Sequence, residues 1–284
     1  MRRYFISILI CGLIILASLL TLRYVLPETC KKFKEYAELS YVALKDGEID
    51  EKSSDTLALQ NLVAHAGGGI ENLSYTNSLE ALNLSYSKGF RFMELDFEWT
   101  NDGYLVLIHD WEESILRLFN ARPRQYSLKE YEHLKMINEM TSLSLDDLAI
   151  WIRQHPDTFI ITDVKRDNIR ALTKIKKRFP ELVRNFIPQI YHFYEYFPVR
   201  TLGYKHIILT LYVAEYSDKV VLKFARKYSL AAVTMTLERA LTDLPRELKK
   251  IGILTYAHTV NKISLQRKLY ANDVFGVYTD FLTP

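Results

Sequence analysis

The chain contains few cysteines and carries little net charge. Only two of its 284 residues are cysteine, and because Cys11 lies inside an apolar run that Cys30 follows, no disulfide is expected between them. The fold must therefore be stable without covalent cross-links. The 37 basic and 34 acidic residues leave a formal charge of +3, an excess too small and too scattered to form a nucleic-acid groove. We expect no nucleic-acid partner.

One long uncharged run stands near the N-terminus. Residues 4–22 contain no charged side chain over nineteen positions, which is long enough to cross the hydrocarbon core of a membrane as a helix. A cleaved signal peptide is the alternative, but no small-x-small cleavage site follows the run. We predict a transmembrane anchor over residues 1–27, a stalk or linker over 28–60, and a catalytic domain over 61–284.

The rest of the chain alternates between two kinds of segment. Runs rich in β-branched and aromatic residues alternate with stretches of helical periodicity, which is typical of an α/β domain. The candidate strands are 62–66, 90–98, 104–110, 159–165, 186–190, 206–212, 230–235, 252–258 and 275–280. The candidate helices are 77–88, 145–154, 169–178, 218–228, 239–250 and 262–270, with a less clearly helical link at 191–204.

The link between the second and third candidate strands decides the topology. It is only Thr100-Asn101-Asp102-Gly103, and such a short link makes a hairpin because parallel neighbours need a crossover of a dozen or more residues. The remaining eight strands with their crossovers predict a (βα)8 TIM barrel with a β-hairpin after the second strand. An open doubly wound sheet is the alternative.

Polar residues stand at or near the C-terminal ends of several apolar strands, and in a barrel these ends converge on one face. Glu94 and Asp96 point to the same side of their strand because they are two positions apart. Two such carboxylates need a cation or a basic partner, and Asp163 would complete an oxygen site suited to one Mg²⁺ or Ca²⁺ ion. Lys165, two positions further, would then face a phosphate on that metal.

Two histidines differ from the others in their context. His65 precedes Gly67, Gly68 and Gly69, where the backbone can approach a ligand closely. His109 ends an apolar strand and precedes an acidic residue that can hold its tautomer. We predict that these two form a general acid/base pair. His258 is intermediate between the catalytic candidates and the structural histidines. The remaining histidines are expected to be structural: His133, His155, His192 and His206.

Taken in order, eight segments resemble the successive motifs of the glycerophosphodiester phosphodiesterase family. They are HAGG at 65–68, TNSLEAL at 76–82, ELD at 94–96, TNDG at 100–103, IHD at 108–110, DVK at 163–165, HTVN at 258–261 and GVYTD at 276–280. The resemblance implies a (βα)8 barrel whose catalytic histidines match His65 and His109. It implies that a divalent metal is bound at the positions of Glu94, Asp96 and Asp163, and that Lys165, Asn77 and Gly67 contact the phosphate or substrate.

Three departures from the family pattern concern the substrate. Ala66 stands where the family usually has Arg, Thr76-Asn77-Ser78 replaces Glu-Asn-Thr, and Asp163 replaces Glu. The expected activity is metal-dependent hydrolysis of a glycerophosphodiester or a related polyol or lipid phosphodiester. Two alternatives remain open: a phosphatidylinositol-type phospholipase that releases a cyclic phosphate, and a catalytically decayed relative that only binds phosphodiesters.

Two further expectations concern the surroundings of the site. Basic residues flank both ends of the N-terminal run, so charge does not decide its orientation. We expect an extracytoplasmic catalytic domain on a single-pass membrane anchor, because an enzyme acting on glycerophospholipid-like material often meets its substrate there. The aromatic run IYHFYEYF at 190–197 is expected either to form a half-buried helix face or to line a sugar or lipid pocket.

Overall fold

The structure is a computed structural model that describes residues 57–284. The predicted anchor and the predicted stalk up to residue 56 lie outside the described residues. Within residues 57–284, no helix combines the length and the apolar character that a membrane span requires. All strands of the sheet belong to one compact unit, which contains every described residue except Tyr216–Phe224.

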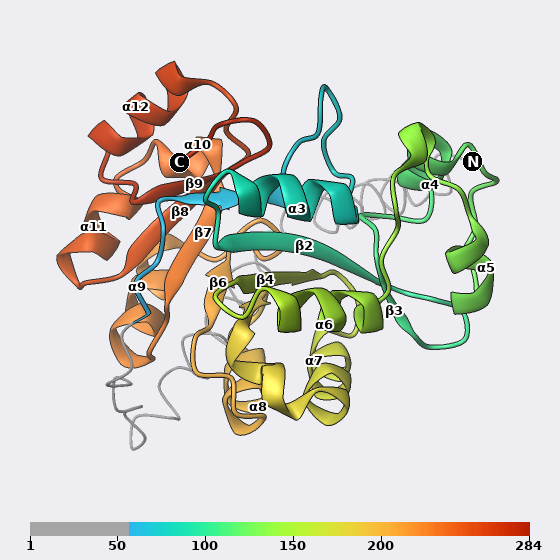
Figure 1. Cartoon of the computed structure of the whole chain (residues 1–284). Helices are drawn as coiled ribbons and strands as arrows, with labels where there is room; N and C mark the ends of the chain where they lie inside the picture. The colour runs from blue at the N-terminus through green and yellow to red at the C-terminus, as the bar shows by residue number, and fades with distance from the viewer. Residues whose placement is uncertain (1–56) are drawn as a thin grey trace, which may run out of the picture. The chain divides into compact units, whose positions relative to one another are not determined.

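Eight parallel strands close into a barrel (Figure 1). They follow the order β1-β9-β8-β7-β6-β5-β4-β2, and a pairing of Ala64 with Met93 joins β1 to β2 and closes the ring. This closure confirms the predicted barrel and excludes the open doubly wound sheet. The strands are β1 (Leu62–Ala64), β2 (Phe92–Trp99), β4 (Phe159–Val164), β5 (Phe186–Ile190), β6 (Ile208–Thr210), β7 (Ala232–Thr236), β8 (Leu254–His258) and β9 (Gly276–Thr279).

The predicted hairpin is also present. Strand β3 (Leu105–Leu107) runs antiparallel to the end of β2. Two helices that the sequence analysis did not predict follow it, α4 (Glu113–Phe119) and α5 (Leu128–His133). A buried apolar cluster that includes Val106, Ile115 and Tyr131 packs them against the hairpin, which explains why these short helices are stable outside the barrel ring.

The crossover helices agree with the predicted ones except in one place. The predicted helix over 239–250 is two helices, α10 (Leu237–Ala240) and α11 (Leu244–Lys250), and Pro245 lies in the first turn of α11, where its missing N–H is tolerated. The other helices are α3 (Leu79–Ser87), α6 (Leu145–Gln154), α7 (Asn168–Arg178), α8 (Tyr196–Thr201), α9 (Asp218–Lys227) and α12 (Ile263–Ala271). Short 3-10 segments occupy His65–Gly67, Ile137–Glu139, Pro180–Asn185 and Phe193–Glu195.

Side-chain alternation along the strands explains where the site lies. One buried residue from each barrel strand contributes to a single core cluster: Val63, Phe92, Ile161, Ile187, Ile208, Ala232, Tyr256 and Tyr278. Residues two positions apart on a strand share a face. Two positions after each core residue the chain carries a polar residue: His65, Glu94, Asp163, Gln189, Thr210, Thr234, His258 and Asp280. A polar layer therefore lies on an apolar floor, towards the carboxyl ends of the strands.

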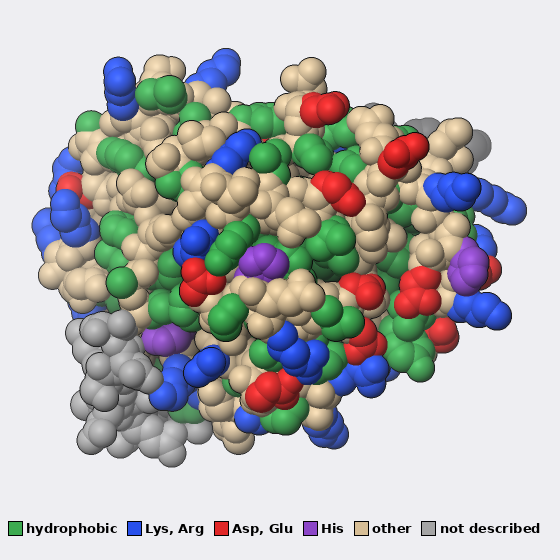
Figure 2. All heavy atoms as spheres, in the orientation of Figure 1, with side chains coloured by type: hydrophobic (Ala, Val, Ile, Leu, Met, Phe, Trp, Pro, Cys, Tyr) green, Lys and Arg blue, Asp and Glu red, His purple; other side chains and the backbone are tan. Residues whose placement is uncertain are grey.

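The surface drawn in Figure 2 carries charges of both signs. Lys and Arg side chains are interspersed with Asp and Glu side chains over the described residues on this face. A histidine side chain is visible near the middle of the face, surrounded by hydrophobic and polar side chains.

Candidate active site

Three buried carboxylates meet at the carboxyl ends of β2 and β4. Glu94 and Asp96 come from β2, and the parallel β2–β4 ladder pairs Asp96 directly with Asp163. One oxygen of each carboxylate lies within 4.8 Å of the corresponding oxygens of the other two. The exposed fractions of Glu94, Asp96 and Asp163 are only 2%, 2% and 8%, so these acidic groups are largely shielded from water. The structure thus brings together the three residues that were predicted to bind a metal.

The electrostatics of this cluster favour a divalent cation. Burial and the charge of Asp96 raise the pKa of Glu94 to about 8. Lys165 places its Nζ 3.0 Å from an oxygen of Asp96 and 3.7 Å from an oxygen of Asp163. The raised pKa of Glu94 indicates that Lys165 and His65 do not fully offset three ionised carboxylates, and a buried uncompensated charge is costly. The all-oxygen donor set therefore fits one hard divalent ion, Mg²⁺ or Ca²⁺.

Two hydrogen bonds from the first βα loop orient the carboxylates. Asn77 donates from Nδ2 to Asp96 and accepts from the Asp96 backbone N–H through Oδ1, both at 3.0 Å. The backbone N–H of Ala66 donates to Glu94 at 2.9 Å. Burial alone would raise the pKa of Asp96, but Lys165, the nearby histidines and the Asn77 bond lower it. The amide of Asn77, predicted to contact substrate, is fully buried and bonded to Asp96 on both sides.

Gly67, the other predicted substrate contact in this loop, faces the protein interior. Its carbonyl accepts a hydrogen bond from the Ser85 hydroxyl at 2.7 Å. A Cβ added at Gly67 would contact Ala81, Leu82 and Leu95, and its φ of +83° lies in the region that favours glycine. Gly67 therefore shapes the turn that carries His65.

His65 is held by a carboxylate from the last strand. Its Nδ1 lies 2.9 Å from Oδ1 of Asp280, and its Nε2 lies 3.9 Å from Glu94. Asn261 fixes Asp280 by donating from Nδ2 to the second carboxylate oxygen at 2.7 Å. Burial by itself lowers the pKa of His65, but the hydrogen bond with Asp280 and the nearby carboxylate charges outweigh it and raise the pKa to about 9.

His109 has a carboxylate partner of its own. Its Nδ1 lies 2.8 Å from Oδ2 of Asp110, and because a carboxylate only accepts, Nε2 is the nitrogen left to face a ligand. Asp110 also accepts from the backbone N–H groups of Glu112, Glu113 and Ser114 at the start of α4. Burial alone would raise the pKa of Asp110, but these hydrogen bonds lower it to about 2. The predicted role of Asp110 as the partner of His109 matches this geometry.

Two tyrosines hold Asp163. Tyr212 donates its hydroxyl to Asp163, with 2.7 Å to each carboxylate oxygen, and Tyr191 donates to Oδ1. Burial, followed by the charge of Asp163, raises the pKa of both tyrosines, so both remain hydrogen-bond donors. Tyr191 belongs to the aromatic run at 190–197, which forms the end of β5, a 3-10 turn and the start of α8 rather than one helix face.

His258 lies in the polar layer with an unusual environment. Its Nε2 is buried and has no hydrogen-bond partner among the described residues. Its ring contacts Tyr212 at a centroid distance of 5.4 Å and Tyr278 at 6.2 Å. Burial lowers the pKa of His258 to about 4, so its imidazole is neutral at neutral pH.

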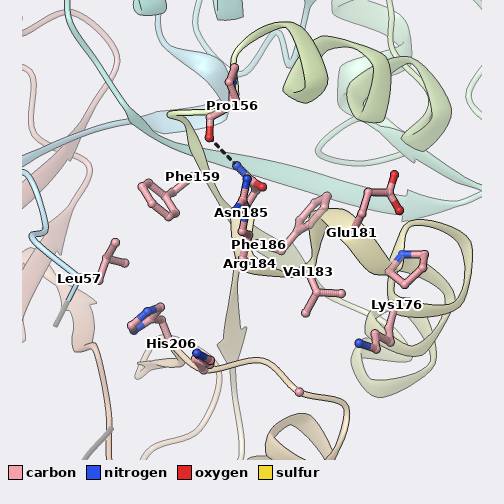
Figure 3. A pocket seen from close by; sticks show the side chains of 13 residues that line it. Leu57, Pro156, Phe159, Lys176, Glu181, Val183, Arg184, Asn185, Phe186 and His206 are labelled. Atoms are coloured by element: carbon pink, nitrogen blue, oxygen red, sulfur yellow. Dashed lines mark hydrogen bonds between the residues drawn. The ribbon is translucent and has the colours of Figure 1, made fainter. Parts of the chain in front are cut away.

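A separate pocket lies at the opposite end of the strands (Figure 3). Its lining includes Phe159 and Phe186, the first residues of β4 and β5, together with Leu57 and His206. Asn185 points toward it, with its side chain bonded to the Pro156 carbonyl. None of the predicted site residues lines this pocket.

Several residues that support the site have no predicted catalytic or metal-binding role. They are Tyr75, Tyr191, Tyr212, Asn261 and Asp280. Asp280 could have been found, because it lies in the segment GVYTD at the end of the last strand, two positions after an inward tyrosine. The tyrosines could not, because an aromatic side chain in a strand or loop is also what an ordinary core requires.

Comparison with known proteins finds a matching family and solved structures with a similar fold. The model of the glycerophosphoryl diester phosphodiesterase family matches residues 65–283. A glycerophosphodiester phosphodiesterase from Thermotoga maritima is 21% identical, with 79% of this chain and 96% of that chain covered and a TM-score of 0.59. A search of curated proteins found no match.

Two other solved structures share the fold at lower identity. A putative glycerophosphodiester phosphodiesterase from Galdieria sulphuraria is 16% identical, with 80% and 95% of the chains covered and a TM-score of 0.61. A phosphodiesterase from Oleispira antarctica, solved with the product sn-glycerol-3-phosphate, is 17% identical, with 78% and 94% covered and a TM-score of 0.58.

Proposed function

This chain belongs to the glycerophosphoryl diester phosphodiesterase family and is a phosphoric diester hydrolase, and on that premise we propose that it cleaves a glycerophosphodiester or a related polyol or lipid phosphodiester. The observation that carries the proposal is the buried cluster of three carboxylates, with His65 Nε2 3.9 Å from Glu94 and His109 close enough for its charge to lower the pKa of Asp96. A product-bound structural neighbour supports a glycerol phosphate group in the substrate.

The carboxylates Glu94, Asp96 and Asp163 would bind the divalent cation. When bound, such a cation stabilises negative charge on phosphoryl oxygens, a contribution of several kcal/mol. Lys165 lies beside the same cluster with a partly exposed side chain, and we assign it to pairing with a phosphate oxygen. We assign Asn77 to holding Asp96, because both ends of its amide are already bonded there.

The two histidines move the protons of the reaction. One takes the proton of the attacking hydroxyl and the other donates a proton to the leaving oxygen, which contributes about 10²- to 10⁴-fold in rate. Asp280 and Asp110 each bind the Nδ1 of one ring and leave its Nε2 for this transfer. The intact set of acid, base and cation-binding groups supports catalysis rather than a decayed binding relative.

A chelator and a substitution test the proposal on the full chain in detergent. We expect turnover of glycerophosphodiesters to stop with a chelator, to return with added Mg²⁺ or Ca²⁺, and to fall by about 10²-fold or more in His109→Ala. His133→Ala is the matched control, because His133 is exposed and its Nδ1 bonds to the Lys129 carbonyl. If His109→Ala hydrolyses these diesters as fast as the unchanged protein, the assigned mechanism is wrong.

The nature of the product and the cellular location are part of the proposal. Phosphorus NMR of the product distinguishes hydrolysis by water from release of a cyclic phosphate by a phospholipase reaction. We also propose that the uncharged N-terminal run anchors the catalytic domain outside the cytoplasm. Protease accessibility of the C-terminal domain in intact cells tests this orientation, and protection of that domain would contradict it.

A further inference from the structure

Tyr75 stands between the two histidines of the candidate active site. Its ring lies 4.4 Å from the ring of His65 and 5.0 Å from that of His109, measured between centroids. Both contacts are edge-to-face, with interplanar angles of 83° and 84°. Edge-to-face packing is a favoured arrangement of aromatic rings, so Tyr75 makes an attractive contact with each imidazole.

Each imidazole has only one described hydrogen bond to hold it. His65 is bonded through Nδ1 to Asp280, and His109 through Nδ1 to Asp110. A single bond at one nitrogen does not by itself fix the plane of the ring. The shared contact with Tyr75 restricts the tilt of both rings at once, although one follows β1 and the other follows β3.

The backbone at Tyr75 is held in an uncommon conformation. Its φ of +56° lies in the left-handed region, which side chains larger than glycine rarely adopt unless their surroundings require it. The N–H of Asn77 donates to the Ala66 carbonyl at 3.1 Å and ties this loop to the turn that carries His65. The loop therefore presents the tyrosine ring to the histidines at a fixed position.

The hydroxyl of Tyr75 has a hydrogen-bond partner of its own in Thr259. Burial raises the pKa of this hydroxyl above its usual value, although a hydrogen bond with Thr259 opposes the shift. The group remains protonated at neutral pH, and its ring is the part that contacts the histidines.

We propose that Tyr75 is a positioning residue that sets the mutual orientation of the His65 and His109 rings, so that both working nitrogens face one phosphodiester. The inference rests on the proposed acid/base function of the two histidines. In the proposed reaction the two rings must serve the attacking and leaving oxygens of the same phosphate, so a tilt of either ring weakens proton transfer without removing a substrate contact.

Three variants at this position separate the ring from the hydroxyl. Tyr75→Phe keeps both edge-to-face contacts and should retain kcat within about threefold, whereas Tyr75→Ala should lower kcat by about 10- to 100-fold with KM changed by less than about threefold. Tyr75→Leu keeps apolar bulk without the ring and should behave like the alanine variant. It serves as the second variant if the alanine protein fails to fold.

A matched control exists elsewhere in the molecule. The ring of Tyr86 contacts His155 edge-on at 4.4 Å, the same separation as between Tyr75 and His65, but outside the site. Tyr86→Ala should therefore leave kcat unchanged. A proline or glycine substitution would change the backbone and is avoided.

A spectroscopic measurement gives a readout that does not depend on turnover. Relaxation of the ring C–H groups of His65 and His109, measured by NMR in full-length protein, reports ring motion and is not affected by the ring current of a neighbouring aromatic side chain. It should show greater ring motion in Tyr75→Ala and Tyr75→Leu and no change in Tyr75→Phe. Unchanged ring motion together with an unchanged kcat in the alanine or leucine variant would overturn the proposal. Equal losses in the phenylalanine and alanine variants would also overturn it, because the hydroxyl would then carry the role. If the unchanged protein turns over no diester at all, the proposed function fails, and the ring motion still decides whether Tyr75 holds the two rings.

Discussion

Replacement of Asp280 by asparagine should impair catalysis through the tautomer of His65. The asparagine side chain has the shape of the aspartate but offers one oxygen and one NH₂ group in place of two acceptors. Asp280 now accepts from His65 on Oδ1 and from the Asn261 amide on Oδ2. If the oxygen of the new amide faces His65, two NH₂ groups oppose each other at Asn261. If that oxygen faces Asn261, the new NH₂ group faces Nδ1 of His65 and requires the wrong tautomer.

The size of the effect follows from the bond that is lost. A hydrogen bond to a charged group contributes about 1.5–3 kcal/mol, which corresponds to about 10- to 150-fold in rate if it acts fully in the transition state. We expect Asp280→Asn to lower kcat/KM by this factor at neutral pH. The assay is kcat/KM for a glycerophosphodiester across the pH range, with saturating Mg²⁺ or Ca²⁺.

A second substitution provides a rescue that tests the reasoning directly. When Asp280→Asn is combined with Asn261→Asp, the new carboxylate accepts from the NH₂ group of the new amide, and the oxygen of that amide is free to accept from His65. The double variant should recover about tenfold or more over Asp280→Asn, because it restores the donors and acceptors without restoring the charge beside His65. Activity of Asp280→Asn within about twofold of the unchanged protein would refute this account.

Stability offers an independent check on the same pair. The pKa of His65 is raised to about 9, so the stability it contributes is present below its unfolded pKa near 6.5 and is lost as the pH rises through about 9. The stability deficit of Asp280→Asn should therefore be largest below about pH 6.5 and should shrink as the pH rises to about 9, as measured by urea unfolding without added metal. A deficit that grows with pH would show that the charge of His65 is not the source.

Three further outcomes are expected. Calorimetric titration should show one divalent cation per chain, and Tyr212→Phe should weaken cation binding by about 10-fold or more, because Asp163 loses a hydrogen-bond donor. Tyr204→Phe is the control and should leave cation binding unchanged, because it removes a buried hydroxyl that bonds to a backbone carbonyl elsewhere. The pKa of His258 is lowered to about 4 in the folded protein, so the unfolded chain takes up this proton at a higher pH than the folded protein does. The free energy of unfolding should therefore fall by about 3 kcal/mol in total as the pH drops from about 6.5 to 4. His258→Phe should lose this slope in urea unfolding, and His133→Phe should keep it. The activity profile of His258→Phe should likewise show no step near pH 4, because the group that titrates there has been removed.

The sequence by itself determined the strand and helix pattern, the hairpin, and the strand faces that carry the candidate site residues. The short Asp-Gly link requires a hairpin, and the eight other strands with their helical crossovers match a closed barrel in number and length. The two-residue period places Glu94 and Asp96 on one face, and places Asp163 and Lys165 on another strand in the same way. The period and the link length depend on neighbouring positions only, which is why they can be read from the sequence, whereas closure of the barrel cannot. The helices α4 and α5 escaped prediction because contacts with the hairpin stabilise them.

Only the tertiary structure decided which supporting groups meet. Closure of the ring sets β9 beside β1 and so brings Asp280 to His65 across 215 positions of sequence. The ladder register pairs Asp96 with Asp163, and the ends of β5 and β6 deliver Tyr191 and Tyr212 to the same carboxylate. A periodic pattern predicts the face of the strand on which a side chain lies, but not which side chain of another strand it contacts. That depends on strand order and register, which arise from the packing of the whole barrel.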